Sequence, residues 1–240
     1  MLVISELRGD VALVTINRHN KRNAISVEVA RALVDALEAL PSQVRAVVLT
    51  GAGSSFSAGA DLGEDKIAGN FFAEFFKLTD ALRRYPAPVI AHINGPAIGA
   101  GMMLSMACDL RTIAPAALFR IPLVDMAIGV DEWTVSTLSD LVGGSRARQL
   151  LYTGAASEAE TMIEAGYGLS AAHLDEALSL ASSLAAKAPL TMRSMKTQFE
   201  RELFDAPARR NAMMAAFESQ DVSEAARARA EKRPPTFRGL

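Results

Sequence analysis

The chain has 240 residues, half of them apolar, and its 27 acidic and 25 basic residues leave a formal net charge of −2. This balance excludes a disordered chain, which would be poor in apolar residues, and a nucleic-acid binder, which would be basic. A single cysteine, Cys108, excludes an internal disulfide and fits a reducing compartment. Residues 1–10 hold no apolar run, and no 18-residue apolar run follows, so we predict a cytoplasmic protein without a secretory signal or a transmembrane segment.

Strands and helices alternate along the first half of the chain. Residues 2–7 and 11–17 predict a hairpin, and Ser26 predicts the start of a helix that Pro41 ends. Three short apolar runs are typical of strands buried on both faces: residues 45–50, 89–93 and 110–113. Helices are expected between these strands, over residues 71–82 and 99–108. This order indicates an α/β fold with mainly parallel strands.

The second half of the chain is rich in alanine and follows a helical pattern. The predicted helices cover residues 147–152, 157–165, 174–188 and most of 192–231. We therefore divide the chain into an α/β core, residues 1–190, and a helical C-terminal region, residues 191–240. The apolar faces of that region suit contact with a neighbouring subunit.

Two stretches of small residues, 51–62 and 94–101, carry the first functional signal. Each follows a buried strand, at the strand end where ligands bind in open α/β folds. The second stretch also opens a helix, whose first N–H groups and dipole favour negative charge. Two such turns side by side can direct two backbone N–H groups at one oxygen, which forms an oxyanion hole. The simpler alternative is a pair of turns packed against a sheet.

These two stretches and three further segments, taken in chain order, resemble the crotonase family, also called the enoyl-CoA hydratase/isomerase superfamily. The segments that carry the resemblance are residues 17–26, 56–62, 94–101, 108–111 and 231–237. The resemblance implies a spiral of ββα units with a helical C-terminal region that forms trimers, giving a homotrimer or a hexamer of two trimers. It also implies an acyl-CoA or enoyl-CoA ligand in fatty-acid metabolism. Coenzyme A is then part of the substrate, and no cofactor is bound covalently.

The resemblance assigns site residues by position. The two oxyanion donors are the backbone N–H groups of Ala60 and Ala100, where Ala100 replaces a glycine of the usual pattern. Two loops beside coenzyme A contribute Lys21, Arg22, Ala24, Ala58, Asp61 and Leu62. Lys232 and Phe237 stand where a neighbouring subunit touches CoA or closes the pocket. For the basic residues among these, a solvated surface is the simpler interpretation.

The departures from the family pattern concern proton transfer. Hydratases of the family use two glutamates to hold and activate water. Here the corresponding positions are Met103, three residues past the second oxyanion donor, and Leu123, which follows Pro122. Neither side chain transfers a proton, and each missing group lowers the rate by about 10²–10⁴-fold. We therefore expect thioester binding with weak or no hydratase activity.

Three nearby acids keep an active enzyme open as an alternative. A two-residue shift of the alignment puts Asp125 at the second glutamate, and the unshifted alignment puts Asp131 where dienoyl-CoA isomerases of the family carry an aspartate. Asp131 and Glu132 precede Trp133, and a carboxylate beside an indole in a pocket can have a raised pKa and act as a base. The other interpretation is a helix that begins here, with Asp131 as its cap.

A narrower likeness rests on residues 128–135 and 141–148. They are similar to a mycobacterial branch of the family that lacks the catalytic glutamates and is described as binding acyl-CoA in lipid metabolism. A third interpretation follows, a non-catalytic carrier that hands acyl chains to lipid-synthesis partners. The histidines and Cys108 lack the spacing of metal ligands, so no metal site is expected.

Overall fold

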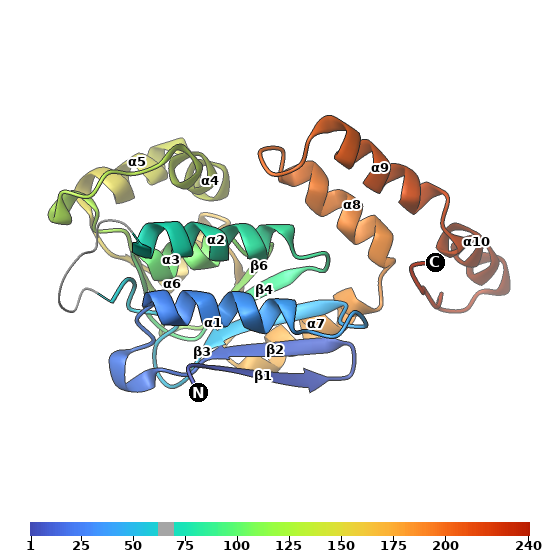
Figure 1. The fold of residues 1–240 in the computed structure, drawn as a ribbon, viewed down its shortest axis with the longest axis horizontal. Helices are drawn as coiled ribbons and strands as arrows, with labels where there is room; N and C mark the ends of the chain where they lie inside the picture. The colour runs from blue at the N-terminus through green and yellow to red at the C-terminus, as the bar shows by residue number, and fades with distance from the viewer. Residues whose placement is uncertain (62–69) are drawn as a thin grey trace.

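The computed structural model describes residues 1–61 and 70–240. Its main sheet has six strands in the order β1-β2-β3-β4-β6-β9 (Figure 1). These strands are β1 (Val3–Arg8), β2 (Val11–Ile16), β3 (Ala46–Gly51), β4 (Val89–Ile93), β6 (Leu110–Ile113) and β9 (Leu169–Ser170). Only the β1–β2 hairpin is antiparallel, and the other neighbours in this sheet are parallel. The hairpin and the three predicted strands are thereby confirmed.

The continuous apolar runs have a physical reason, because both faces of the sheet are covered. Side chains alternate along β3, so that Val47 and Leu49 belong to one buried cluster and Ala46 and Val48 to another. Helices α1 (Val27–Glu38), α2 (Asn70–Arg84) and α3 (Ala100–Met106) pack on the first cluster, and α7 (Leu174–Ala185) covers the second. Ser26 caps α1, as predicted, by accepting a hydrogen bond from the Val29 N–H at 3.3 Å.

A second, smaller sheet joins three very short strands in the order β5-β7-β8. They are β5 (Ala97–Ile98), β7 (Leu118–Arg120) and β8 (Ser157–Glu158), and α6 (Ala159–Glu164) follows the last of them. β5 pairs in parallel with β7, and β7 pairs antiparallel with β8. This sheet fixes the glycine-rich turn that precedes α3 against the middle of the chain.

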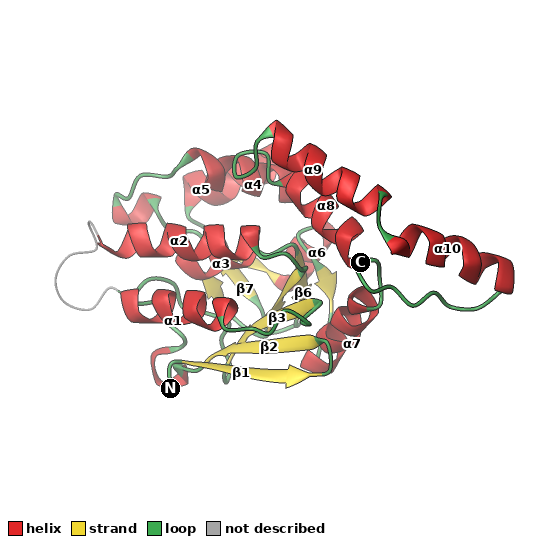
Figure 2. Cartoon of the chain, turned by 45° about the vertical axis from the view of Figure 1, so that its right-hand side comes forward, coloured by secondary structure: helices red, strands yellow, loops and turns green. Residues whose placement is uncertain are grey.

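The remaining helices lie around this core. α4 (Glu132–Val142) and α5 (Gly144–Thr153) form a pair, reached through a short 3₁₀ turn over Val124–Met126. The predicted helical region at the C-terminus divides into α8 (Pro189–Phe199), α9 (Ala206–Phe217) and α10 (Gln220–Glu231). Figures 1 and 2 show these three helices extending away from the main sheet. Phe199 and Phe217 on this arm are 85% and 68% exposed, so the arm has apolar surface for a second copy, and subunit contact stays a prediction.

The C-terminal tail returns from α10 to the core. Arg45 Nη1 donates to the Phe237 carbonyl at 2.8 Å, and the buried Asp221 carboxylate accepts the backbone N–H groups of Arg238 and Gly239 at 2.7 and 2.9 Å. These bonds fix the end of the chain between α10 and the start of β3.

Candidate functional site

The two glycine-rich turns lie side by side, as the sequence predicts. Ser57 bridges Ala97 in parallel, since the Ser57 N–H donates to the Pro96 carbonyl at 3.1 Å and the Ser57 carbonyl accepts from Ile98 at 3.0 Å. Gly101, in the first turn of α3, leaves no room for a side chain, because a Cβ there would lie 2.5 Å from the Ser57 carbonyl oxygen. The turn after β3 therefore packs directly against the start of α3.

The backbone on both sides of Ala60 is held by hydrogen bonds to Ile25. The Ile25 N–H donates to the Gly59 carbonyl at 2.7 Å, and the Ile25 carbonyl accepts from Asp61 at 2.9 Å. In such a parallel bridge the two bonds go to the residues that flank Ala60, so the N–H of Ala60 itself points away from Ile25.

Gly59 brings this segment against Ala100. Its φ of +95° is a conformation that favours glycine, and a Cβ added to it would lie 2.6 Å from the Ile98 carbonyl oxygen and 3.6 Å from the Ala100 nitrogen. Ala100 is the first residue of α3, so its N–H has no carbonyl partner within the helix. The backbone amides of Ala60 and Ala100 thus belong to one junction of three chain segments.

Asn23 holds this junction together, and sequence reasoning assigned it no role. Its side chain is fully buried and donates to the carbonyls of Ala52 and Ser55 at 2.8 and 2.7 Å, while its Oδ1 accepts from the Arg18 N–H at 3.0 Å. Ser57 Oγ donates to the Asn23 carbonyl at 2.8 Å. The one sequence signal for Asn23 was its place beside Arg22 in the first segment that resembles the family. A side chain that bonds only backbone groups is neither a catalytic nor a ligand-binding residue, so no motif of that kind singles it out.

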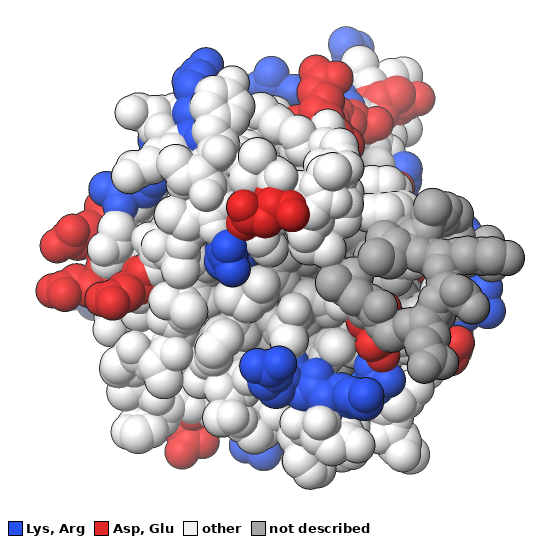
Figure 3. All heavy atoms as spheres, turned by 90° about the vertical axis from the view of Figure 1, so that its left-hand side faces the viewer, with Lys and Arg blue, Asp and Glu red and all other residues white. Residues whose placement is uncertain are grey.

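The loop predicted to meet coenzyme A surrounds this junction. Arg18 pairs with Asp61 at 2.6 Å and also donates to the Ala24 carbonyl at 3.1 Å, so that it ties the loop before α1 to the turn after β3. Lys21 and Arg22 are exposed on the 3₁₀ turn His19–Lys21 and its cap. Figure 3 shows this end of the molecule, where a group of basic side chains borders a largely uncharged surface.

The other residues predicted for these loops have plainer positions. Ala24 is buried, and Ala58 donates its N–H to the Arg22 carbonyl at 2.9 Å. Leu62 lies outside the described residues. Their part in ligand binding stays a prediction.

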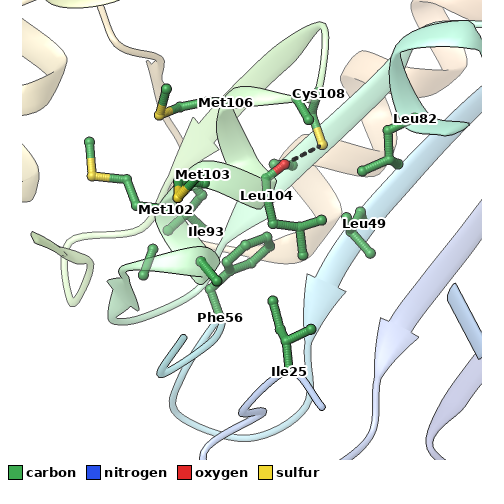
Figure 4. Close-up of a cluster of buried hydrophobic side chains, with 14 of the residues drawn as sticks. Ile25, Leu49, Phe56, Leu82, Ile93, Met102, Met103, Leu104, Met106 and Cys108 are labelled. Carbon is green, nitrogen blue, oxygen red and sulfur yellow. Dashed lines mark hydrogen bonds between the residues drawn. The ribbon is translucent and has the colours of Figure 1, made fainter. Parts of the chain in front are cut away.

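The two positions where family hydratases carry glutamates lie in apolar surroundings here. Met103 is 6% exposed on α3, and Leu123 packs against the same buried cluster. Figure 4 shows Met102, Met103 and Met106 on one side of α3, while Leu104 points toward Leu49 and Ile25. The side of α3 that bears Met103 is therefore lined by buried thioethers.

Two of the three nearby acids are engaged elsewhere. Asp131 caps α4, accepting from the N–H and the hydroxyl of Thr134 at 2.9 and 2.8 Å. Asp125 is exposed and pairs with Arg120 at 2.8 Å, and Glu132 is exposed in the first turn of α4. Each of these arrangements has an ordinary structural reason.

The end of α10 and the C-terminal tail, which carry Lys232 and Phe237, lie at the opposite end of the fold from the loop that precedes α1 (Figures 1 and 2). Lys232 is exposed at the end of α10, and Phe237 is partly buried with its carbonyl bonded to Arg45. One chain alone therefore does not bring them to Ala60 and Ala100, so their predicted role needs a neighbouring subunit.

Residues 1–61 and 70–240 contain no helix that is both long and apolar enough to cross a membrane. Within the same ranges, no three side chains of His, Cys, Asp or Glu are grouped to hold a metal ion.

Known proteins are similar to this chain in sequence and in fold. The family model described as enoyl-CoA hydratase/isomerase matches residues 6–239. The chain is 38% identical over 233 residues to the "probable enoyl-CoA hydratase echA6" of Mycobacterium tuberculosis, covering 95% of this chain and 96% of that protein. It is 30% identical over 219 residues to the human mitochondrial Δ(3,5)-Δ(2,4)-dienoyl-CoA isomerase, covering 81% and 67%. The crystal structure of an enoyl-CoA hydratase from Bacillus anthracis matches with a TM-score of 0.89 and 28% identity over 100% of both chains.

Proposed function

The chain belongs to the enoyl-CoA hydratase/isomerase family, and on this premise we propose that it binds the coenzyme A thioester of an acyl or enoyl group. The thioester carbonyl oxygen lies between the N–H groups of Ala60 and Ala100. The observation that carries this proposal is the seating of Gly59 against the backbone of Ile98–Ala100, which places the two amides in one junction. Fixed backbone donors stabilise a developing oxyanion strongly, because they need no reorganisation when the charge forms.

Coenzyme A lies along the basic loop in this proposal. Its phosphates meet Lys21 and Arg22, which are exposed, while Arg18 is held by Asp61 and keeps the loop in place. An exposed lysine or arginine gains a charge-assisted bond to a phosphate at little cost in desolvation. Lys232 and Phe237 of a neighbouring subunit complete the pocket in a homotrimer or in a hexamer of two trimers.

The chemistry of the site favours binding over hydration. Two amides polarise the thioester, but Met103 and Leu123 supply no group to deprotonate water. The carboxylate of Asp131 is used by the start of α4, and that of Asp125 by Arg120. We therefore favour a thioester-binding protein of fatty-acid metabolism over a hydratase or isomerase that depends on Asp125, Asp131 or Glu132.

The test combines binding with turnover. Calorimetry with butyryl-CoA should show saturable binding, and crotonyl-CoA should lose its enoyl absorbance at least about 10²-fold more slowly than with a glutamate-bearing relative. Gly59→Ala should abolish binding, because its Cβ would meet the Ile98 carbonyl. The matched control is Gly9→Ala, a glycine that also has positive φ but has no heavy atom within 4 Å of the added Cβ.

Two outcomes would contradict the proposal. Absence of binding to any thioester would remove it altogether. Turnover as fast as that of the relative, and lost in Asp131→Asn, would instead establish the active enzyme.

A further inference from the structure

A cavity of about 470 Å³ lies where the central strands of the main sheet begin. Its lining includes Asp10, Arg45 and Pro88, which directly precede β2, β3 and β4. These three strands are parallel, and the glycine-rich turns follow β3 and β4 at their other ends. Since the six residues of β3 span about 20 Å, the cavity is separate from the Ala60–Ala100 junction.

Distant parts of the chain close around this cavity. Arg45 donates from Nη1 to the Phe237 carbonyl at 2.8 Å and from Nη2 to the Lys187 carbonyl at 3.2 Å. One guanidinium thereby joins the tail and the segment after α7 to the core. Gly239 packs against Pro189, the first residue of α8, since a Cβ added to Gly239 would lie 2.7 Å from the Pro189 side chain. The walls of the cavity therefore bond or contact one another, which makes it a defined part of the fold.

Positive charge is concentrated in the lining of the cavity. Four basic side chains and one carboxylate line it, namely Arg45, Lys187, Arg193 and Arg238 with Asp10. In residues 1–61 and 70–240, every ion pair of an arginine or lysine involves basic side chains other than these four. Like charges repel, so an anion between these side chains lowers the electrostatic energy of the cavity.

The types of the lining side chains indicate which anion fits. Arginine presents a fork of donors that matches two phosphate oxygens, and lysine adds a point charge. Ser42 and Gln43 in the same lining bring a hydroxyl and an amide, which also donate to oxygen. A single phosphate group carries a charge of about −1.5 to −2, so four cations match two linked phosphate groups. The volume lies within the range of small-molecule sites.

We propose that this cavity is a second binding site, which takes a small soluble polyanion of the diphosphate class. The inference does not depend on the proposed function, because the two sites lie at opposite ends of the parallel strands. Arg45 belongs to the core, Arg193 to α8 and Arg238 to the tail. A bound diphosphate therefore links these three parts and stabilises the place where the C-terminal arm leaves the core.

The experiment uses inorganic pyrophosphate as the probe. It is titrated by calorimetry into the full chain at constant ionic strength, because salt screens exposed charges. Saturable binding of one pyrophosphate per chain is expected. Arg193→Gln and Arg238→Gln should each weaken it about tenfold, since a hydrogen bond to a charged group contributes at least about that factor. Both side chains are exposed, so both variants should fold.

A matched control and a second assay make the test specific. Arg210→Gln removes the same charge from an exposed arginine on α9 that is not part of the lining, and it should leave pyrophosphate affinity unchanged. Flotation with phosphatidylglycerol vesicles separates a soluble anion from a lipid headgroup. The chain should not float with these vesicles.

Four outcomes would overturn the proposal. They are absence of pyrophosphate binding, equal affinity of Arg193→Gln and the original chain, and an equal loss of affinity in Arg210→Gln. The fourth is flotation with the vesicles by a chain that binds no pyrophosphate. Weakening by Lys21→Gln in place of Arg193→Gln would assign the pyrophosphate to the basic loop, and this result too would remove the second site.

Discussion

The two sides of the candidate site are built in different ways. On the amide side, the segments around Ala60 and Ala100 are joined through Asn23, Ser57 and Gly59 by backbone bonds and close backbone contact. On the other side stand Met103 and Leu123, with Asp131 committed to a helix cap. The side proposed to bind a carbonyl is thus a property of the fold, while proton transfer on the other side would depend on single side chains.

This difference shows which part of a site can change without loss of structure. Replacing the backbone donors would require a different path of the chain. Replacing a glutamate by a methionine changes one side chain and avoids the cost of burying a carboxylate. A family can therefore keep its ligand while the chemistry is lost.

The largest expected effect comes from the amide side. Asn23→Ala should lower the free energy of unfolding by about 3 kcal/mol, because three bonds of a buried amide are lost. Denaturant unfolding measures this, and thioester affinity should fall with it. Asn20→Ala, an exposed neighbour, is the control, and equal stability of the two variants would refute the role given to Asn23.

Restoring acids on the other side should create hydratase activity. Met103→Glu combined with Leu123→Glu should raise the rate of crotonyl-CoA hydration by about 100-fold or more, since each acid–base group contributes about 10²–10⁴-fold. The absorbance of the enoyl group measures the rate. The matched double glutamine variant should stay at the original rate, and a gain in that variant would show that proton transfer is not the cause.

Asp131 separates a structural from a chemical role. Asp131→Ala should lower stability by about 1 kcal/mol, the usual effect of losing a helix cap. Asp131→Asn should keep the cap and the stability. Neither variant should alter thioester affinity or turnover. A loss of turnover in Asp131→Asn at unchanged stability would show that Asp131 acts as an acid or base.

The smallest effect is expected at Asp125. Its ion pair with Arg120 is exposed, so Asp125→Asn should change the free energy of unfolding by less than about 0.5 kcal/mol. Crotonyl-CoA turnover should be unchanged. A specific decrease in turnover would support the shifted alignment, in which Asp125 takes the place of the second glutamate.

In the main sheet, β2, β3, β4 and β6 were predictable because they are buried on both faces, which leaves continuous apolar runs in the sequence. β9, which consists of two exposed residues, was not predicted. The small sheet was not, because strands of two or three residues such as Ala97–Ile98 form only where distant segments meet. The same limit applies to the long C-terminal helical stretch, which the structure divides at Asp205, the cap of α9, and at Ser219 before α10.

The candidate site shows the same division. The glycine-rich turns were predicted because small residues after buried strands are a local pattern. Arg18 and Asp61 are 43 positions apart, so their ion pair depends on the folded arrangement of two loops. For Asp131 the sequence left a cap and a base open, and the structure shows the cap.

The close seating of Gly59 and Gly101 on neighbouring carbonyls also determines how the chain can evolve. Any side chain at either position would separate the two turns, so random mutation should find almost no accepted substitution there. Met103 belongs to a buried apolar cluster and Leu123 packs against it, so the neighbouring side chains can adapt to a substitution. In a library of variants selected for thioester binding, the glycines should stay invariant while new reactive side chains accumulate beside them.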